Sequence, residues 1–379
     1  MGNKKPWKSP LALTFALSAL LLIAVTAWLM TDPATSRSDA LKTGGLAGGA
    51  VVALYALWLN DRRRDVEERR QDIERKRHEL ETLRTDRDRE RISDERFAKA
   101  VELLGNSADQ VRVGAMHALA GVARSRPDYV QTVLDVLCSY LHQPFVHPKR
   151  GPEDEEVADL PAENVQQQRE LQVRLTAQRL IVSLLPEAGE AAAPSYDLDL
   201  TGAVLEYFDL SGHKVGELLM RYADLCNSTN LSDCEITGRA YFTAAKTETG
   251  RLSGRFYCQR TIFHDRAWFS GVRFEANADF EGTTFTGEAN FKNAVFGEDV
   301  SLRGTKFGST LNMRETEFTG HTNLMFASAP KSVDLYNTFA DAKQVLELPP
   351  NWKPETVDDE RVRLTIPGYP MPAKDPNCD

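Results

Sequence analysis

The sequence lacks the motifs by which many enzymes and metalloproteins are recognised. Its 379 residues contain no G-x-S-x-G, H-E-x-x-H or P-loop pattern. Histidine is scarce as well, and His213, His264 and His321 lie far apart along the chain. Without a nucleophile–base pair or a ligand cluster an enzyme is not expected. We therefore predict no catalytic residue, no cofactor and no metal site.

Cysteine is also scarce and shows no regular spacing. The five cysteines include no C-x-x-C pair, and no histidine stands at zinc-finger spacing from them. An odd number without a framework indicates reduced thiols in a reducing compartment, and small buried apolar side chains are their simplest role. The cysteines are Cys138, Cys226, Cys234, Cys258 and Cys378.

An excess of positive charge is absent too. The net charge is −9 and the isoelectric point is near 5.5, so the chain has no overall attraction for nucleic acid. We expect no direct nucleic-acid partner. The hydrophobic content of 42% is ordinary for a folded protein, and 379 residues suggest roughly two or three domains.

Charge is missing entirely from two stretches near the N-terminus, Leu11 to Met30 and Thr43 to Asn60. A helix needs about 20 apolar residues to cross a bilayer core about 30 Å thick. We therefore predict two transmembrane helices in a membrane anchor formed by residues 1–60. A cleaved signal peptide is the alternative for the first stretch, but no A-x-A site follows it.

Basic residues flank these two stretches on the same side. Lys4, Lys5 and Lys8 precede the first, and a cluster of arginines follows the second. Positively charged flanks remain in the cytoplasm, so we expect a multi-pass protein of the inner (cell) membrane with both termini cytoplasmic. Membrane lipids are then one expected partner, because juxtamembrane arginines attract anionic headgroups.

Glycine is concentrated in the second stretch. Gly44, Gly45, Gly48 and Gly49 form two overlapping G-x-x-x-G spacings. Small residues one turn apart allow two helices in a membrane to approach closely. We predict transmembrane packing at these glycines, against the first helix or against a second copy of the chain in a homo-oligomer.

Residues 61–92 alternate acidic and basic side chains without glycine or proline. Opposite charges four residues apart favour a solvated helix. Val66, Ile73 and Leu80 recur every seven residues, which is the spacing of a coiled-coil seam. The segment is predicted to be either a single charged helix or one strand of a parallel coiled coil.

Residues 93–186 carry apolar residues at helical spacing and predict a small HEAT-like helical module. A stretch rich in proline and acidic residues, 143–162, predicts a linker inside it. The last helix is expected to pack on the module or to cap the segment that follows. Its apolar face consists of Leu171, Leu175, Val182 and Leu185.

The strongest pattern is a repeat in residues 196–330. From Phe263 onward, large apolar residues recur at alternating steps of six and five, with a small or β-branched residue two positions before nearly every one. Stacked coils bury such residues, because each meets its equivalent in the next coil. The predicted solenoid core is Leu225, Leu231, Phe263, Phe269, Phe274, Phe280, Phe285, Phe291, Phe296, Leu302, Phe307, Met313, Phe318 and Leu324.

These units resemble the pentapeptide-repeat family, whose unit is A-(D/N)-(L/F)-x-x. The resemblance implies a right-handed quadrilateral β-helix from about residue 198 to 326, although the alternating step leaves the coil cross-section open. The complete layout is similar to membrane-anchored pentapeptide-repeat proteins of actinobacterial type. The units that match best are Ala223-Asp224-Leu225, Ala278-Asp279-Phe280 and Ala289-Asn290-Phe291.

The predicted fold is therefore mixed: two transmembrane helices, a long charged helix, a helical module and a β-solenoid, followed by an irregular proline-rich tail at 331–379. A membrane-tethered cytoplasmic scaffold that binds a protein partner without catalysis fits this layout. The alternative is a DNA mimic that modulates a type II topoisomerase. The segment Tyr196 to Pro330 holds 18 acidic and 13 basic residues, which is acidic but diluted by arginine.

Overall fold

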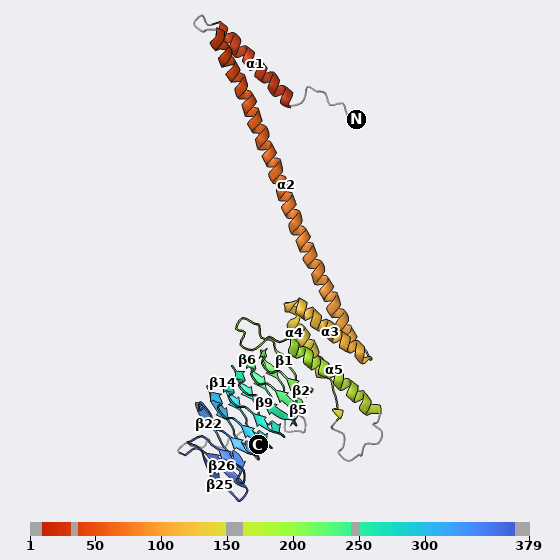
Figure 1. Cartoon of the computed structure of the whole chain (residues 1–379), viewed down its shortest axis with the longest axis vertical. Coiled ribbons are helices and arrows are strands. Elements are labelled where there is room, and N and C mark those ends of the chain that lie inside the picture. Colours follow the sequence, from red (N-terminus) through yellow and green to blue (C-terminus); the bar gives the residue numbers. More distant parts are fainter. Residues whose placement is uncertain (1–9, 32–36, 149–161, 244–250, 368–379) are drawn as a thin grey trace, which may run out of the picture. The chain divides into compact units, whose positions relative to one another are not determined.

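The computed structural model describes the chain in four stretches and divides it into two compact units between Arg91 and Ile92. Lys4, Lys5, Lys8, Cys378 and most of the predicted linker fall outside the described residues. The described stretches are 10–31, 37–148, 162–243 and 251–367 (Figure 1).

The first unit is a pair of helices, α1 (Pro10–Met30) and most of α2 (Arg37–Leu104). They meet at Gly48, where the Ser18 hydroxyl donates to the Gly48 carbonyl over 2.7 Å. A Cβ at Gly48 would stand 3.3 Å from the Leu22 side chain. Gly45 and Gly49, by contrast, are exposed and face open space. Glycine thus allows a close helix contact at one of the predicted positions.

In the part of the chain that the structure describes, no helix has a stretch both long and apolar enough to cross a membrane. This finding contradicts the two predicted transmembrane helices, and with them the multi-pass inner-membrane location. The prediction relied on two uncharged, mostly apolar runs, Leu11 to Met30 and Thr43 to Asn60. In the structure the second run is only one part of α2, which continues into the charged residues after Asn60.

The charged half of α2 is solvated. Ile73 and Leu80, two members of the seven-residue spacing, are 66% and 56% exposed. Arg70 and Glu74 form an i,i+4 ion pair at 3.4 Å. The structure contains one copy of the chain, so a coiled-coil dimer through this seam stays a prediction.

The second unit begins with the helical module. The end of α2, α3 (Asp109–Ser125), α4 (Val130–Leu141) and α5 (Ala162–Leu184) surround one apolar core. The 3-10 turn Pro127–Tyr129 leads into α4. The core side chains include Met116, Leu119, Leu134, Leu137 and Ile181. The module is therefore helical, as predicted from the apolar spacing.

The rest of the second unit is a β-solenoid (Figure 1). Strand pairing joins Ile262 to Thr284 and Thr284 to Lys306, so one coil takes 22 residues. Consecutive short strands in a coil belong to different faces, and we number the four faces in the order in which the chain meets them from Ile262 onward. A coil with steps of six, five, six and five residues therefore has a four-sided cross-section. The alternating step is thus compatible with a quadrilateral coil.

Each face is a ladder of parallel strands. Face 1 consists of β3 (Lys214–Val215), β6 (Glu235–Ile236), β10 (Ile262–Phe263), β14 (Thr284–Phe285) and β18 (Lys306–Phe307). Face 2 consists of β1 (Leu198–Asp199), β4 (Leu218–Leu219), β7 (Ala240–Tyr241), β11 (Ala267–Trp268), β15 (Ala289–Asn290), β19 (Thr310–Asn312) and β22 (Ser332–Asp334).

Faces 3 and 4 share two longer strands at the start of the solenoid, β2 (Val204–Asp209) and β5 (Asp224–Asn230). Face 3 then continues through β8 (Arg251–Leu252), β12 (Arg273–Phe274), β16 (Val295–Phe296), β20 (Glu317–Phe318) and β23 (Phe339–Asp341). Face 4 continues through β9 (Arg255–Tyr257), β13 (Ala278–Asp279), β17 (Val300–Ser301), β21 (Thr322–Asn323) and β24 (Leu346–Glu347).

The large residues of the repeat point inward and stack from coil to coil. Phe263 and Phe285 are parallel with ring centroids 5.1 Å apart, and Phe285 continues onto Phe307 at 5.4 Å. The same stacking occurs on face 2 and face 3. All fourteen side chains of the predicted solenoid core are buried, from Leu225 to Leu324.

The residue two positions before each large one also points inward, and where it is threonine its hydroxyl has a partner. Thr261 donates to the Leu231 carbonyl of the previous coil over 2.5 Å, and Thr305 donates to the Phe280 carbonyl over 3.1 Å. Cys234 occupies the same column, with its thiol 2.9 Å from the Leu210 carbonyl. These hydroxyls therefore link neighbouring coils, and that of Thr322 instead bonds the Gly320 carbonyl of its own coil, so each is satisfied within the core.

Two segments differ from the sequence prediction. The predicted core includes no residue between Leu231 and Phe263, yet Leu252 on β8 and Phe256 on β9 are buried. The tail from residue 331, expected to be irregular, adds β22, β23 and β24 to the faces and ends in the antiparallel pair β25 (Lys353–Thr356) and β26 (Arg361–Thr365). Strand β26 also pairs with β23. The tail thus extends the solenoid and closes part of its far end.

Candidate interaction surfaces

The outward-facing side chains of the solenoid form columns, because each coil places equivalent residues above one another. On face 2 the central column runs through the outward residues of seven strands. Most of its members are polar, as expected for a solvated face, but three consecutive members are apolar or aromatic. The column reads Asp199, Leu219, Tyr241, Trp268, Asn290, Asn312 and Asp334.

Leu219, Tyr241 and Trp268, with the arginines beside them, form what we call the aromatic–arginine patch. Tyr241 and Trp268 meet edge to face with centroids 5.1 Å apart. The Arg221 guanidinium lies 4.4 Å from the centre of the Tyr241 ring, and that of Arg239 lies 5.9 Å away. Aromatic and arginine side chains are the types most enriched in protein–protein interfaces.

The charges around the patch are largely paired. The Arg239 guanidinium forms an ion pair with Glu217 at 2.8 Å. Further along the same face, Arg314 and Asp334 are 3.0 Å apart, and Arg314 lies 4.5 Å from the centre of the Tyr336 ring. The face is therefore a mixture of rings and paired charges, with no long run of one sign.

A second surface feature lies where the helical module meets the first coil. Helix α4 contacts β1, and α5 contacts β2. The Gln131 amide of α4 pairs with the Asp197 backbone in both directions: its NH2 donates to the Asp197 carbonyl over 2.9 Å, and its oxygen accepts the Asp197 N–H over 2.9 Å. Helices α4 and α5 thus lie against the first coil, and α5 also packs on α3 and α4, so the last helix does both of the things that the sequence left open.

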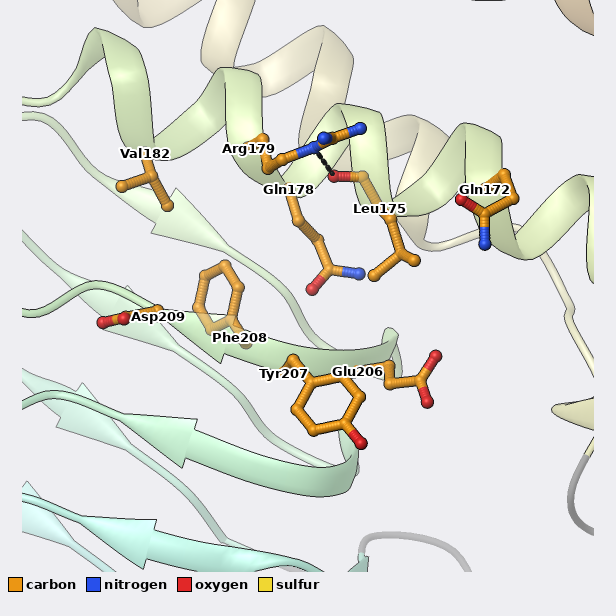
Figure 2. Close-up of a pocket in the computed structure, with 9 residues that line it drawn as sticks. All are labelled: Gln172, Leu175, Gln178, Arg179, Val182, Glu206, Tyr207, Phe208 and Asp209. Carbon is orange, nitrogen blue, oxygen red and sulfur yellow. Dashed lines mark hydrogen bonds between the residues drawn. The ribbon is translucent and has the colours of Figure 1, made fainter.

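Between α5 and β2 the cover is incomplete, and a pocket of about 400 Å³ remains. Figure 2 shows Leu175, Gln178 and Val182 descending from α5 toward β2. The remaining lining residues are Gln172, Arg179, Glu206, Tyr207, Phe208 and Asp209.

Gln178 is the unusual member of this lining. It is 4% exposed, yet among the described residues neither its amide nitrogen nor its amide oxygen has a hydrogen-bond partner. Its position was detectable from the sequence, because Gln178 falls on the same helical face as Leu171, Leu175, Val182 and Leu185. The four apolar residues predict the buried face, and the single polar residue among them is the signal that marks the pocket.

Tyr207 forms the opposite lip of the pocket. Its φ of +50° is in the left-handed region that favours glycine, and the pairing of β2 with β5 shifts register between Glu206 and Phe208. The bulge turns the Tyr207 ring outward, where it is 61% exposed. Seven other non-glycine residues in the described part of the solenoid, Asn227 of β5 among them, also have a positive φ, so this conformation is a feature of the coils.

Glu206, beside Tyr207, is buried, and its carboxylate contacts two neighbouring side chains. Its carboxylate accepts from the Asn227 amide over 2.5 Å and lies 3.6 Å from the ring nitrogen of His147, which is also buried. Asp209 is exposed and accepts the Ser211 N–H over 2.9 Å. The lower edge of the pocket therefore carries two carboxylates.

The histidines considered above do not gather. His213 hydrogen-bonds backbone carbonyls near its own turn, His264 pairs with Glu235 at 3.1 Å and His321 with Glu347 at 3.2 Å. Over the described ranges, no three histidine, cysteine or acidic side chains are placed to hold a metal ion. The four described cysteines are free and buried.

The comparison with known families agrees with this architecture. Residues 280–324 match the family described as pentapeptide repeats (9 copies). No curated protein and no solved structure is significantly similar to the chain. Pentapeptide-repeat solenoids are generally non-enzymatic. The family match over residues 280–324 and the stacked four-sided coils together support pentapeptide repeats in the solenoid.

Proposed function

We propose that the chain is a non-catalytic interaction protein and that face 2 binds a protein partner. The fold is consistent with such a role. The observation that supports face 2 is the aromatic–arginine patch, in which the partly exposed Leu219 and Trp268 lie on either side of the buried Tyr241 in an otherwise polar column. A partially exposed tryptophan and two exposed arginines are side chains whose burial by a partner contributes most to affinity.

The neighbouring coils supply the variant that tests this proposal. The column places Asn290 and Asn312 directly after Trp268, so Trp268→Asn introduces a residue that the fold already accepts there. A photo-reactive residue at Ser270, adjacent on face 2, should cross-link a partner protein in the native cell. Trp268→Asn should reduce the cross-linked product at least tenfold.

A matched control lies on face 1, where Ile262 is exposed and the next coil carries Thr284 at the same position. Ile262→Thr should leave the yield from Ser270 unchanged. Capture of no protein from Ser270, or equal yields from Trp268→Asn and the unaltered chain, would exclude face 2 as the binding surface.

The alternative function, a DNA mimic acting on a type II topoisomerase, rests on the acidic excess of the solenoid. A mimic needs continuous negative charge along its length. Arginines interrupt that charge, since Glu217, Asp233 and Asp334 are all paired with arginine. This alternative predicts that the purified chain changes topoisomerase-driven supercoiling, and the absence of any change would remove it.

A further inference from the structure

The pocket between α5 and β2 has two sets of backbone-like hydrogen-bonding groups on its walls. One is the buried Gln178 amide, which offers one donor and one acceptor side by side. The other is the outer edge of β2. Among the described strands β2 pairs only with β5, so the alternate N–H and C=O groups on its other edge face α5. Both sets are complementary to the same ligand group, a peptide unit.

The contact between the helical module and the first coil already contains one glutamine amide paired with a peptide unit. Gln131 on α4 holds the N–H and the C=O of Asp197 with its amide, at 2.9 Å each. Gln178 stands on the adjacent helix of the module with no equivalent partner in the described chain. A buried amide left unpaired is unfavourable, which favours any segment that satisfies it.

The walls and the rim of the pocket define the segment further. Leu175, Val182 and Phe208 are apolar, and Tyr207 offers an exposed ring. Asp209 is exposed and acidic. The Arg179 guanidinium is turned back along α5, where it donates to the Leu175 carbonyl over 3.3 Å and to the Thr176 hydroxyl over 3.1 Å. Asp209 is thus the exposed carboxylate of the lining, and it favours a basic residue at the end of a bound segment that lies beside it.

We propose that this pocket binds an extended peptide segment of a protein partner, apolar in the middle and basic at its ends. The segment adds to the free edge of β2 and pairs one of its peptide units with the Gln178 amide. Strand addition to an exposed edge is a common mode of peptide recognition. The inference rests on the proposed function, because it assumes a protein partner, but it concerns a different surface from the aromatic–arginine patch.

The test uses the purified full-length chain and a pool of synthetic peptides, acetyl-Lys-X-X-X-Lys-amide, in which X is Val, Leu, Phe or Tyr. Binding is measured by ligand-observed NMR. We expect members of the pool to bind, and N-methylation of the central residue to weaken the best of them at least tenfold, because the methyl group removes the donor. Replacing the terminal lysines by glutamates should weaken binding at least threefold.

Two variants of α5 test whether the Gln178 amide causes the sensitivity of binding to N-methylation. Gln178→Leu removes the amide and leaves a slightly shorter apolar side chain, so it should abolish the difference between the methylated and unmethylated peptides. It should also raise the melting temperature of the unliganded chain, which shows that the variant folds. Gln172→Leu makes the same change at an exposed position on the pocket lip and should alter binding less than twofold.

Failure of every peptide to bind would overturn the inference, as would equal sensitivity to N-methylation in the Gln178→Leu variant. These outcomes are separable from failure of the proposed function. The Ser270 cross-link in the cell depends on face 2, whereas the peptide measurement depends on α5 and β2 and needs no cellular partner.

Discussion

Single buried threonines act as links between coils of the solenoid. Thr305 is fully buried, and its hydroxyl bonds the Phe280 carbonyl one coil away. The sequence indicated only that a small or β-branched residue belongs at this position. That criterion treats threonine, valine and alanine alike, so the hydrogen bond could not be predicted from the repeat itself.

We expect Thr305→Val to lower the free energy of unfolding by about 1–2 kcal/mol, because the isosteric side chain packs equally well but loses a buried hydrogen bond. Thr284→Val is the control, since Thr284 points outward on face 1 and its change should stay within about 0.5 kcal/mol. Urea unfolding of both variants measures the difference. Equal effects of the two substitutions would contradict a structural role for the Thr305 hydroxyl.

A buried arginine fixes the helical module. Arg174 is 1% exposed, donates to the Leu141 and Gln143 carbonyls over 3.0 and 2.6 Å, and stacks on the Phe145 ring at 4.6 Å. Arg174→Met retains most of the packing but leaves both carbonyls without this donor. We expect a loss of about 3 kcal/mol in thermal or chemical unfolding. Arg169→Met on the exposed side of the same helix should have almost no effect.

At the scale of elements, the repeat was predictable and its irregular parts were not. Phenylalanine at a fixed spacing predicts stacked coils, because only stacking buries it. The longer strands β2 and β5 were missed, since they run across a position where later coils turn. The strands after residue 331 were missed because their core positions, such as Leu335 and Ala340, no longer follow the phenylalanine spacing.

The coils approach each other closely at one corner, so adding a single methyl group there should lower the free energy of unfolding. A Cβ on Gly287 would stand 2.5 Å from the carbonyl carbon of Asp265 in the previous coil. Gly287→Ala is therefore expected to destabilise the chain by at least about 2 kcal/mol, since backbone cannot move aside easily. Calorimetry or urea unfolding measures this change.

The same substitution in α3 should have the opposite sign. Gly121 lies inside the helix with open space around the position of a Cβ. Gly121→Ala should stabilise the chain by about 0.5–1 kcal/mol, because alanine is the better helix former. A stabilising effect at both positions would show that the coils are less tightly stacked than described.

At the scale of the whole second unit, one apolar core continues from the helical module into the solenoid. Buried cysteines lie in both the helical module and the solenoid, so their reactivity can follow the unfolding of each. Burial raises the pKa of Cys138 in α4 and of Cys234 in the solenoid to about 12, and it raises the pKa of Cys258 as well. Thiols that remain protonated and covered react slowly with alkylating reagents.

We expect these three thiols to become reactive at the same urea concentration, because a shared core unfolds cooperatively. Pulsed alkylation followed by mass spectrometry of the peptides measures each site separately. Earlier labelling of Cys138 than of Cys258 would show that the module opens independently of the solenoid.

The raised pKa values also predict weaker folding in alkali. A thiol that titrates near 9 when unfolded and near 12 when folded binds more protons in the folded state between these values. The free energy of unfolding contributed by such thiols is constant below about pH 9 and falls as the pH rises toward 12. Urea midpoints measured from pH 7 to 11 should decline, and the decline should be smaller in Cys234→Val.

The antiparallel pair β25 and β26 determines how long the solenoid can become. The last coil of any solenoid exposes backbone donors and acceptors to which a further parallel coil can pair. Nothing in the repeat itself prevents this addition. By lying against β23 in the opposite direction, β26 ends that progression on face 3. A chain cut before residue 331 would lack this terminator, and its exposed coil would become a template on which further copies could polymerise end to end.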